Sequence, residues 1–547
     1  MRKMLVLMTC LWASVSGLYA QVERPKLVVG IVVDQMRADY LYRFYDKFSE
    51  GGFKRMMREG FHGQNTHYNY VPTETAPGHA TVYTGTIPAI HGIVGNEWYE
   101  KGASRYCVFD STVNTVGAET LNGKMSPRNM FVTTIGDQLK LATNQQAKVI
   151  GISIKDRGAI LPAGHTANGA FWYDRLAGRF ISSTFYGATL PDWVQRYNDL
   201  KRPDQFLTET WSPLLPLDQY TESLSDDNPF ERISPGKETP TFPYNLAEIK
   251  EAMQKQQMKQ SPYDFLTYTP FGNTLVKEMA LAALEGESLG EDAITDLLAI
   301  SFSSTDIIGH AFGLNSVELQ DCYLRLDKDL ADILAALDKK VGKGNYLVFL
   351  TADHAAVEVP AYLNSLQMPS GYFKVREMKQ SVQDYLAGLY GEGAWLEEAD
   401  DKQIYFNHAL LQEKKLNPVV LQQQVAAYLR NFEGVYNTYI AEDMQREEYS
   451  LGLRHLLQNG FYPNRCGDVL LQLKPGWLTD YWGRGTSHGS PYTYDTQVPL
   501  LFWGWRIRPT TTTEWLQVID IAPTLAMLLH VQLPSGAIGK PIQALFK

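Results

Sequence analysis

The chain of 547 residues is 44% hydrophobic and 20% charged, which provides material for a large core and excludes an intrinsically disordered protein. Its 60 acidic and 50 basic residues give a net charge of −10, so bulk charge attracts neither nucleic acid nor acidic membranes. An anionic small-molecule substrate would therefore need a local positive centre.

The first twenty residues are typical of a secretory signal peptide. Arg2 and Lys3 precede a short apolar run, and small residues follow up to Ala20. We expect cleavage near Ala20, with a cut after Gly17 as the alternative, and the apolar run is too short to span a bilayer. The mature protein, with 48 basic and 60 acidic residues, would carry about −12 and be periplasmic or secreted.

Five apolar stretches rich in β-branched residues predict strands that are buried on both faces of a parallel sheet. Helical periodicity lies between them, notably over residues 132–142, 274–284 and 317–341. Strands that alternate with helices indicate an α/β fold, a doubly wound and mainly parallel sheet flanked by helices. The predicted strands cover residues 26–33, 147–154, 296–302, 345–350 and 498–503.

Two long stretches interrupt this alternation, at about residues 161–268 and 355–482. We interpret them as insertions that form a lid over the strand ends, within a single domain that spans residues 21–547. The second stretch contains a predicted helix at 419–429 and a predicted strand at 468–473. No segment after the signal peptide is predicted to cross a membrane, and we favour a monomer.

Polar side chains follow four of the predicted strands at the point where each strand ends. Ligands of doubly wound sheets bind beyond the carboxyl ends of the strands, so we expect these side chains to lie together. An isolated Asp in such a place is often a helix cap, and an isolated Lys or Arg a surface charge, but neither alternative explains the clustering. The residues are Asp34, Lys155, Arg157, Asp306, Asp353 and His354.

Several of these side chains, and two further histidines, are of the types that bind metals. Asp306 and His310 are four residues apart, a spacing that brings both side chains to one side of a helical turn. Carboxylate and imidazole ligands suit zinc, and their number would fill two sites, although an isolated histidine is more often a buried structural residue. The candidate ligands are Asp34, Asp306, His310, Asp353, His354 and His488.

The stretch from Val71 to Gly85 presents a threonine at the start of a predicted helix. Pro77 fits the first helical turn, where free N–H groups can face an anion. A hydroxyl at Thr75 could therefore be aimed at a phosphate, while the alternative is that Thr75 only caps the helix.

Taken in order, these motifs resemble the alkaline phosphatase superfamily. Within it, the chain is similar to the bacterial phosphate-irrepressible alkaline phosphatases, which combine a threonine nucleophile with a Lys-x-Arg pair. The resemblance runs from about Lys26 to Thr524. The motifs that carry it are Val33-Asp34, Thr73-Glu-Thr-Ala-Pro-Gly-His79, Gly92-Ile-Val-Gly-Asn96, Asp306-x-x-x-His310, Thr351-Ala-Asp-His354 and Gly485-x-x-His488.

The resemblance implies two zinc ions per chain. The best-known alkaline phosphatases also have a third, magnesium site, but this sequence shows no sign of it, so we expect only two metals. One zinc would be held by a set that includes the oxygen of the nucleophile: Asp34, Thr75, Asp353 and His354. The other zinc would be held by Asp306, His310 and His488. The phosphoryl oxygens would be contacted by Asn96, Lys155 and Arg157.

We therefore expect a phosphate monoesterase of broad range that works through a covalent phosphothreonine. A zinc ion favours the alkoxide of Thr75 for attack on phosphorus, and the second zinc stabilises the leaving oxygen. Lys155 and Arg157 add two cations, which favour a doubly charged monoester over a diester.

Two other functions stay open. A nucleotide pyrophosphatase or phosphodiesterase of the same superfamily would share the two-zinc site, and a non-catalytic secreted protein could use these side chains to bind metal or glycans. A sulfatase is disfavoured, because Thr75 cannot give the formylglycine that its chemistry needs. His79, one helical turn after Thr75, has no assigned role.

Overall fold

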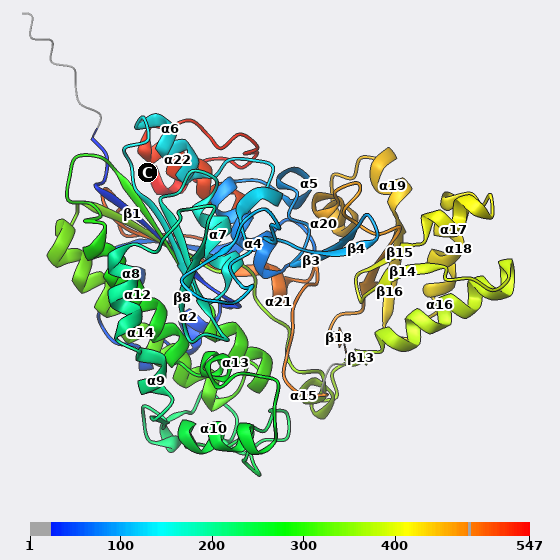
Figure 1. The fold of residues 1–547 in the computed structure, drawn as a ribbon, viewed down its shortest axis with the longest axis horizontal. Helices are drawn as coiled ribbons and strands as arrows, with labels where there is room; N and C mark the ends of the chain where they lie inside the picture. The colour runs from blue at the N-terminus through cyan, green and yellow to red at the C-terminus, as the bar shows by residue number, and fades with distance from the viewer. Residues whose placement is uncertain (1–22, 480–482, 547) are drawn as a thin grey trace, which may run out of the picture.

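The computed structural model describes residues 23–479 and 483–546, so the predicted signal peptide lies outside the described residues (Figure 1). Its centre is an eleven-stranded sheet. In sheet order the strands are β20 (Thr510–Thr512), β2 (Phe61–His67), β19 (Gln497–Gly504), β12 (Tyr346–Thr351), β1 (Leu27–Val33), β11 (Asp296–Phe302), β6 (Val149–Ser153), β7 (Gly169–Asp174), β8 (Arg179–Ser183) and β5 (Thr115–Val116), with β21 (Leu516–Gln517) also paired to β2.

The middle of the sheet is parallel. Strands β12, β1, β11, β6 and β7 run in one direction, and Val29 pairs with Leu298 on one side and with Val348 on the other. The predicted α/β class is confirmed, and all five predicted strands are present. The fifth, β19, runs antiparallel to β12, contrary to the parallel pattern inferred from its sequence. An apolar run indicates only that a strand is buried on both faces, and a parallel and an antiparallel strand can be buried equally.

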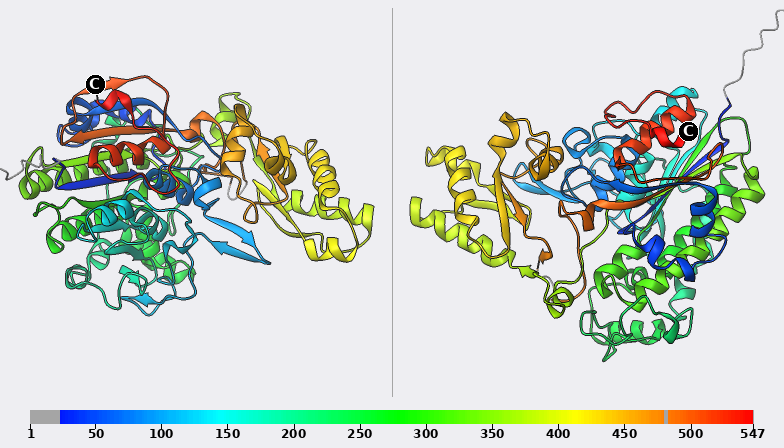
Figure 2. Two further views of the ribbon diagram at one scale, coloured as in Figure 1. Left: turned by 90° about the horizontal axis from the view of Figure 1, so that it is seen from above. Right: turned by 180° about the vertical axis from the view of Figure 1, so that it is seen from behind.

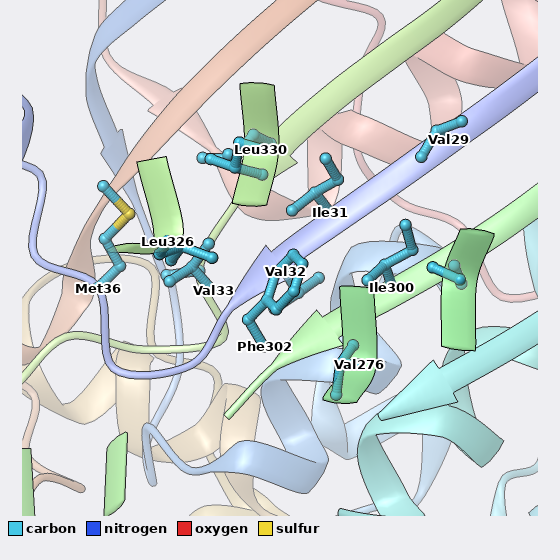
Figure 3. Close-up of a cluster of buried hydrophobic side chains, with 14 of the residues drawn as sticks. Val29, Ile31, Val32, Val33, Met36, Val276, Ile300, Phe302, Leu326 and Leu330 are labelled. Carbon is cyan, nitrogen blue, oxygen red and sulfur yellow. The ribbon is translucent and has the colours of Figure 1, made fainter. Parts of the chain in front are cut away.

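Helices cover both faces of this sheet (Figure 2). One layer packs over β6, β7 and β11, and the other packs over β11 and β6. Figure 3 shows part of the core, in which Ile31 and Val33 of β1 lie beside Leu326 and Leu330 of α14. The first layer contains α4 (Thr75–Thr84), α6 (Ile135–Ala142), α7 (Asp156–Ala163) and α22 (Ile521–Leu529); the second contains α12 (Phe271–Gly286), α13 (Ser304–Phe312) and α14 (Val317–Leu337).

A second lobe, residues 371–479, lies beside the main sheet (Figure 1). It has a four-stranded antiparallel sheet with its own hydrophobic core, and the hairpin of β3 (Glu97–Glu100) and β4 (Ala103–Tyr106) extends towards it. This lobe lies within the second predicted insertion, whereas β7 and β8 of the main sheet lie within the first. Its elements include α16 (Val375–Tyr390), β14 (Leu396–Ala399), β15 (Gln403–Phe406), α18 (Pro418–Leu429), β16 (Val435–Ile440) and β17 (Val469–Leu473).

Within the described ranges, none of the helices combines the length and the apolar composition needed to cross a membrane.

Candidate active site

The predicted site residues meet at one edge of the main sheet. Asp34 follows β1, Asp306 lies in the first turn of α13 after β11, and Asp353 and His354 follow β12. Lys155 caps α7 directly after β6. The carboxyl ends of neighbouring parallel strands meet at the same edge, so the order of the strands brings together side chains that are far apart in sequence.

The metal-ligand side chains form two groups, in each of which the candidate ligand atoms lie within 4.8 Å of one another. The inner group is Asp34, Asp306 and His354, and the outer group is Asp306, His310 and His488. Asp306 belongs to both. The resemblance placed Asp353 in the inner set, where the structure groups Asp306; Asp353 is adjacent, with its Oδ2 3.7 Å from His354 Nε2.

All three histidines are held in the same tautomer. Each donates its Nδ1–H to a backbone carbonyl, which leaves the Nε2 lone pair available to a metal. His310 Nε2 lies 3.0 Å from Asp306 Oδ1, so a proton or a cation has to lie between these two atoms. The three carbonyl contacts are His310 to Thr486 (2.7 Å), His354 to Ala355 (2.9 Å) and His488 to Thr73 (2.7 Å).

Burial and neighbouring side chains shift the pKa values of these histidines. Burial lowers the pKa of His354, and burial together with two adjacent imidazoles lowers the pKa of His488 well below its usual range. Burial opposes the charged form of His310 as well, but the Asp306 carboxylate more than offsets it and raises the His310 pKa. Neutral imidazoles are the form in which histidine binds metal.

The inner group and the adjacent Asp353 contain buried polar atoms without a hydrogen-bond partner. Asp34 Oδ1, Asp353 Oδ2 and His354 Nε2 make no hydrogen bond, and all three residues are 0% exposed. Burial and the Asp34 charge together raise the pKa of Asp353 well above its usual range. Leaving such groups unpaired is costly, and a divalent cation would satisfy them at once. The donor set therefore fits zinc.

Lys155 brings a positive charge into the same cluster. Its Nζ lies 2.7 Å from Asp34 Oδ2 and 2.7 Å from Asp306 Oδ2, and 3.5 Å from the hydroxyl Oγ1 of Thr75. Lys155 therefore contacts the Thr75 hydroxyl and an aspartate of each ligand group.

Thr75 is the first residue of α4 and is 1% exposed. The helix start can approach β12 closely because Gly78 has no side chain: a Cβ there would lie 2.2 Å from the Asp353 carbonyl oxygen. The partial positive charge of a helix N-terminus favours an anion at this place. The hydroxyl thus faces the carboxylate cluster from the helix end.

Asn96 contacts the start of α4, and Arg157 contacts the β3–β4 hairpin. Asn96 Oδ1 accepts a hydrogen bond from the Ala76 N–H of α4 at 2.9 Å. Arg157 donates from Nη1 to the Tyr106 hydroxyl at 2.9 Å, while its buried Nε has no partner. Lys155, Arg157, Asp306 and His310 all line one cavity of about 470 Å³.

Three supporting residues were not found from the sequence. Gln35, with φ of 65°, donates from Nε2 to Asp306 Oδ1 at 2.7 Å, and its position next to Asp34 was the only signal. Glu74 accepts the Asn96 N–H, and the Tyr106 hydroxyl binds Arg157. Their partners lie 22 or more residues away, beyond the reach of motif spacing.

His79, which had no predicted role, braces the first turn of α4. Its Nδ1–H donates to the Thr75 carbonyl at 2.8 Å, and its Nε2 accepts from the Ser301 hydroxyl at 2.9 Å. Burial lowers its pKa to about 4, so it is neutral at physiological pH and keeps both hydrogen bonds.

Comparisons with known proteins agree with this geometry. The profile of the family "Type I phosphodiesterase / nucleotide pyrophosphatase" matches residues 28–493. Alkaline phosphatase PafA of Elizabethkingia meningoseptica is 46% identical over 525 residues, covering 95% of this chain and 94% of PafA. A Myroides odoratus protein named as a calcium-transporting ATPase is 45% identical over 531 residues, covering 96% of this chain and 95% of that protein.

A crystal structure of PafA superposes with a TM-score of 0.92 at 45% identity, and the match covers 96% of this chain and all of PafA. Agreement at this level extends over both the main sheet and the second lobe. The chain therefore belongs to the type I phosphodiesterase / nucleotide pyrophosphatase family and, within it, to the alkaline phosphatases related to PafA.

Proposed function

We propose that the protein is a two-zinc phosphate monoesterase that acts through a covalent phosphothreonine in the periplasm or outside the cell. One observation carries the proposal. The Thr75 hydroxyl, at a helix N-terminus, lies 3.5 Å from a lysine ammonium that is shared by two buried carboxylates, beside three histidines with available Nε2 atoms. This combination supplies a nucleophile, a phosphoryl contact and a cation-binding centre.

The two ligand groups would each hold one ion. Asp34, Asp353 and His354 would bind the inner ion and Asp306, His310 and His488 the outer one, with Asp306 within reach of both. When bound, zinc supplies Lewis acidity that favours an alkoxide over a hydroxyl and offsets charge on a departing oxygen.

The chain itself supplies the nucleophile and its orientation. Thr75 Oγ1 forms a bond to phosphorus, the ester P–O bond breaks, and the alcohol leaves. Water then cleaves the phosphothreonine, releasing inorganic phosphate and restoring the hydroxyl. His79, bonded to the Thr75 carbonyl, holds the first turn of α4 in place during both steps.

Lys155 and Arg157 favour a monoester. Lys155 lies beside the nucleophile, and Arg157 keeps a buried Nε–H without a partner at the same cavity. The three non-bridging oxygens of a monoester dianion can bind both cations, whereas a diester has a second ester group in place of one of these oxygens. This arrangement favours a monoesterase over the phosphodiesterase activity that the family name also includes.

A chromogenic aryl phosphate and the matching diaryl phosphate test the proposal. The purified protein should hydrolyse the monoester faster, lose that activity on chelation and regain it when zinc returns. Thr75→Ala should retain two zinc ions per chain, measured by mass spectrometry, and lose turnover by at least about 10³-fold. Faster diester turnover would favour the phosphodiesterase, and activity in Thr75→Ala would exclude this nucleophile.

A further inference from the structure

A lysine of the second lobe contacts the segment that leads into α4. Lys402, the residue before β15, places its Nζ 3.1 Å from Glu74 Oε1 and 3.0 Å from Asp401 Oδ1. Glu74 belongs to the main α/β unit and directly precedes Thr75. The two side chains of the inter-lobe pair are only 28% and 13% exposed, so solvent screens their attraction less than that of a surface ion pair.

Glu74 connects this ion pair to Asn96. Its second oxygen, Oε2, accepts the Asn96 backbone N–H at 2.7 Å, and the Asn96 carboxamide in turn accepts the Ala76 N–H at 2.9 Å. Ala76 directly follows Thr75. A continuous set of polar contacts therefore runs from Lys402 through Glu74 and Asn96 to both neighbours of the nucleophile.

Two further contacts join the second lobe to the main α/β unit near Lys402. Tyr99 of β3 packs on Tyr405 of β15, with ring centroids 5.8 Å apart, at the place where the β3–β4 hairpin extends towards the second lobe (Figure 1). The stem of Lys402 packs on Gly489, the residue after His488, where an added Cβ would lie 2.9 Å from Lys402 Cε. Lys402 thus lies between the start of α4 and the loop that carries a candidate ligand.

We propose that Lys402 is a positioning residue: by holding Glu74 it fixes the carboxamide of Asn96 and the first turn of α4, so that the second lobe completes the phosphoryl-binding side of the site. The inference rests on the proposed function, in which Asn96 contacts the phosphoryl group. An ion pair of purely structural value would instead contribute to stability and leave the action of Asn96 unchanged.

A double-mutant cycle separates these two roles. Lys402→Ala should lower kcat/KM for an aryl phosphate monoester about tenfold, the loss expected when a charge-assisted hydrogen-bond network loses its cation. In an Asn96→Ala background the same change should cost less than about twofold, because the residue through which Lys402 acts is already absent. Lys402→Arg, which keeps the charge, should retain most of the activity.

A matched control comes from the same lobe. Lys379 pairs with Glu398 at 2.6 Å but lies on the lobe surface, and Lys379→Ala should leave kcat/KM within about twofold of wild type. If Lys402→Ala does not fold, Lys402→Gln keeps most of the stem against Gly489 and replaces it in the cycle.

The results have distinct meanings. A kcat/KM loss that is the same in the wild-type and Asn96→Ala backgrounds, or no loss at all, would overturn the positioning role. A wild-type protein that hydrolyses no monoester would overturn the proposed function and this inference with it, whereas an active wild type with independent effects would overturn the inference alone.

Discussion

Two clusters of buried acidic side chains in the described residues have different surroundings. At the strand ends, Asp34, Asp306 and Asp353 lie among three histidines and the Lys155 ammonium. Where the loop over residues 221–243 packs on α14, Glu231 and Glu318 are equally buried, at 0% exposure. Their side-chain partners are neutral: the Asn228 amide donates to Glu231, and the Tyr244 hydroxyl donates to Glu318 at 2.6 Å.

This difference shows how a buried carboxylate is neutralised. Both glutamates keep one oxygen without a partner, and burial raises the pKa of each, with the Glu318 charge raising that of Glu231 further. Because the side-chain hydrogen-bond donors of these glutamates are neutral, a proton neutralises the charge. Among the described residues, sets of three candidate ligands occur only at the strand ends, where imidazoles with available Nε2 atoms are present. Acidity alone therefore does not make a metal site.

Of the variants that test this comparison, Asp306→Asn should have the largest effect on zinc content and turnover. Asp306 is the candidate ligand shared by both groups among the described residues, so under the proposed function its loss should reduce zinc content and lower monoester turnover by more than the roughly 100-fold typical of residues that only support ligands. Zinc is counted by mass spectrometry beside the assay. Glu318→Gln is the matched control in the other cluster and should keep both zinc ions; zinc loss there would break the comparison.

The phosphoryl contacts should give the next largest effect. Lys155→Ala with Arg157→Ala should lower monoester kcat/KM by roughly 10- to 100-fold for each residue, since a hydrogen bond to a charged group contributes about 1.5–3 kcal/mol. The diester should lose less than about tenfold, because it presents one charged oxygen fewer. The ratio of the two rates is the measurement, and equal losses on both substrates would contradict these roles.

Much of the site was predictable from the sequence because its ligands follow the strands directly. Asp34, Asp353 and His354 follow apolar runs that are recognisable as strands, and the four-residue spacing of Asp306 and His310 predicted one helical face. The sharing of Asp306 between two groups was not predictable, since spacing relates a residue to its own helix and not to a neighbouring strand. The structure therefore gathers the same predicted residues but groups Asp306, in place of Asp353, with Asp34 and His354.

The fold, like the site, was predictable from the sequence only in part. The apolar runs located the strands of the main sheet but not the direction of β19, which depends on how the chain returns to the sheet. The second lobe gave only two recognisable elements, near α18 and β17, because its other strands are short. Contacts made by the second lobe, such as Lys402 with Glu74, span more than 300 residues and leave no local pattern.

The glutamate pair should respond to pH rather than to metal. The pKa values of both glutamates are raised in the folded state, so the unfolded chain loses these protons first as pH rises. The contribution of the pair to stability is therefore present at acid pH and is lost as pH rises through the folded pKa values. Glu231→Gln removes one titrating group while keeping an oxygen for the Asn228 amide. The variant should therefore gain about 1–3 kcal/mol over wild type at pH 9 and little at pH 5.

Urea unfolding at both pH values, with zinc held in excess, measures this difference. Glu285→Gln serves as the control, because Glu285 is exposed and pairs with Lys340 at the surface, where loss of the charge should shift stability little at either pH. A gain for Glu231→Gln that is equal at pH 5 and pH 9 would show that the carboxylate is not neutralised by a proton. A loss of bound metal in this variant would place a cation at the glutamates, and the distinction between the two acidic clusters would fail.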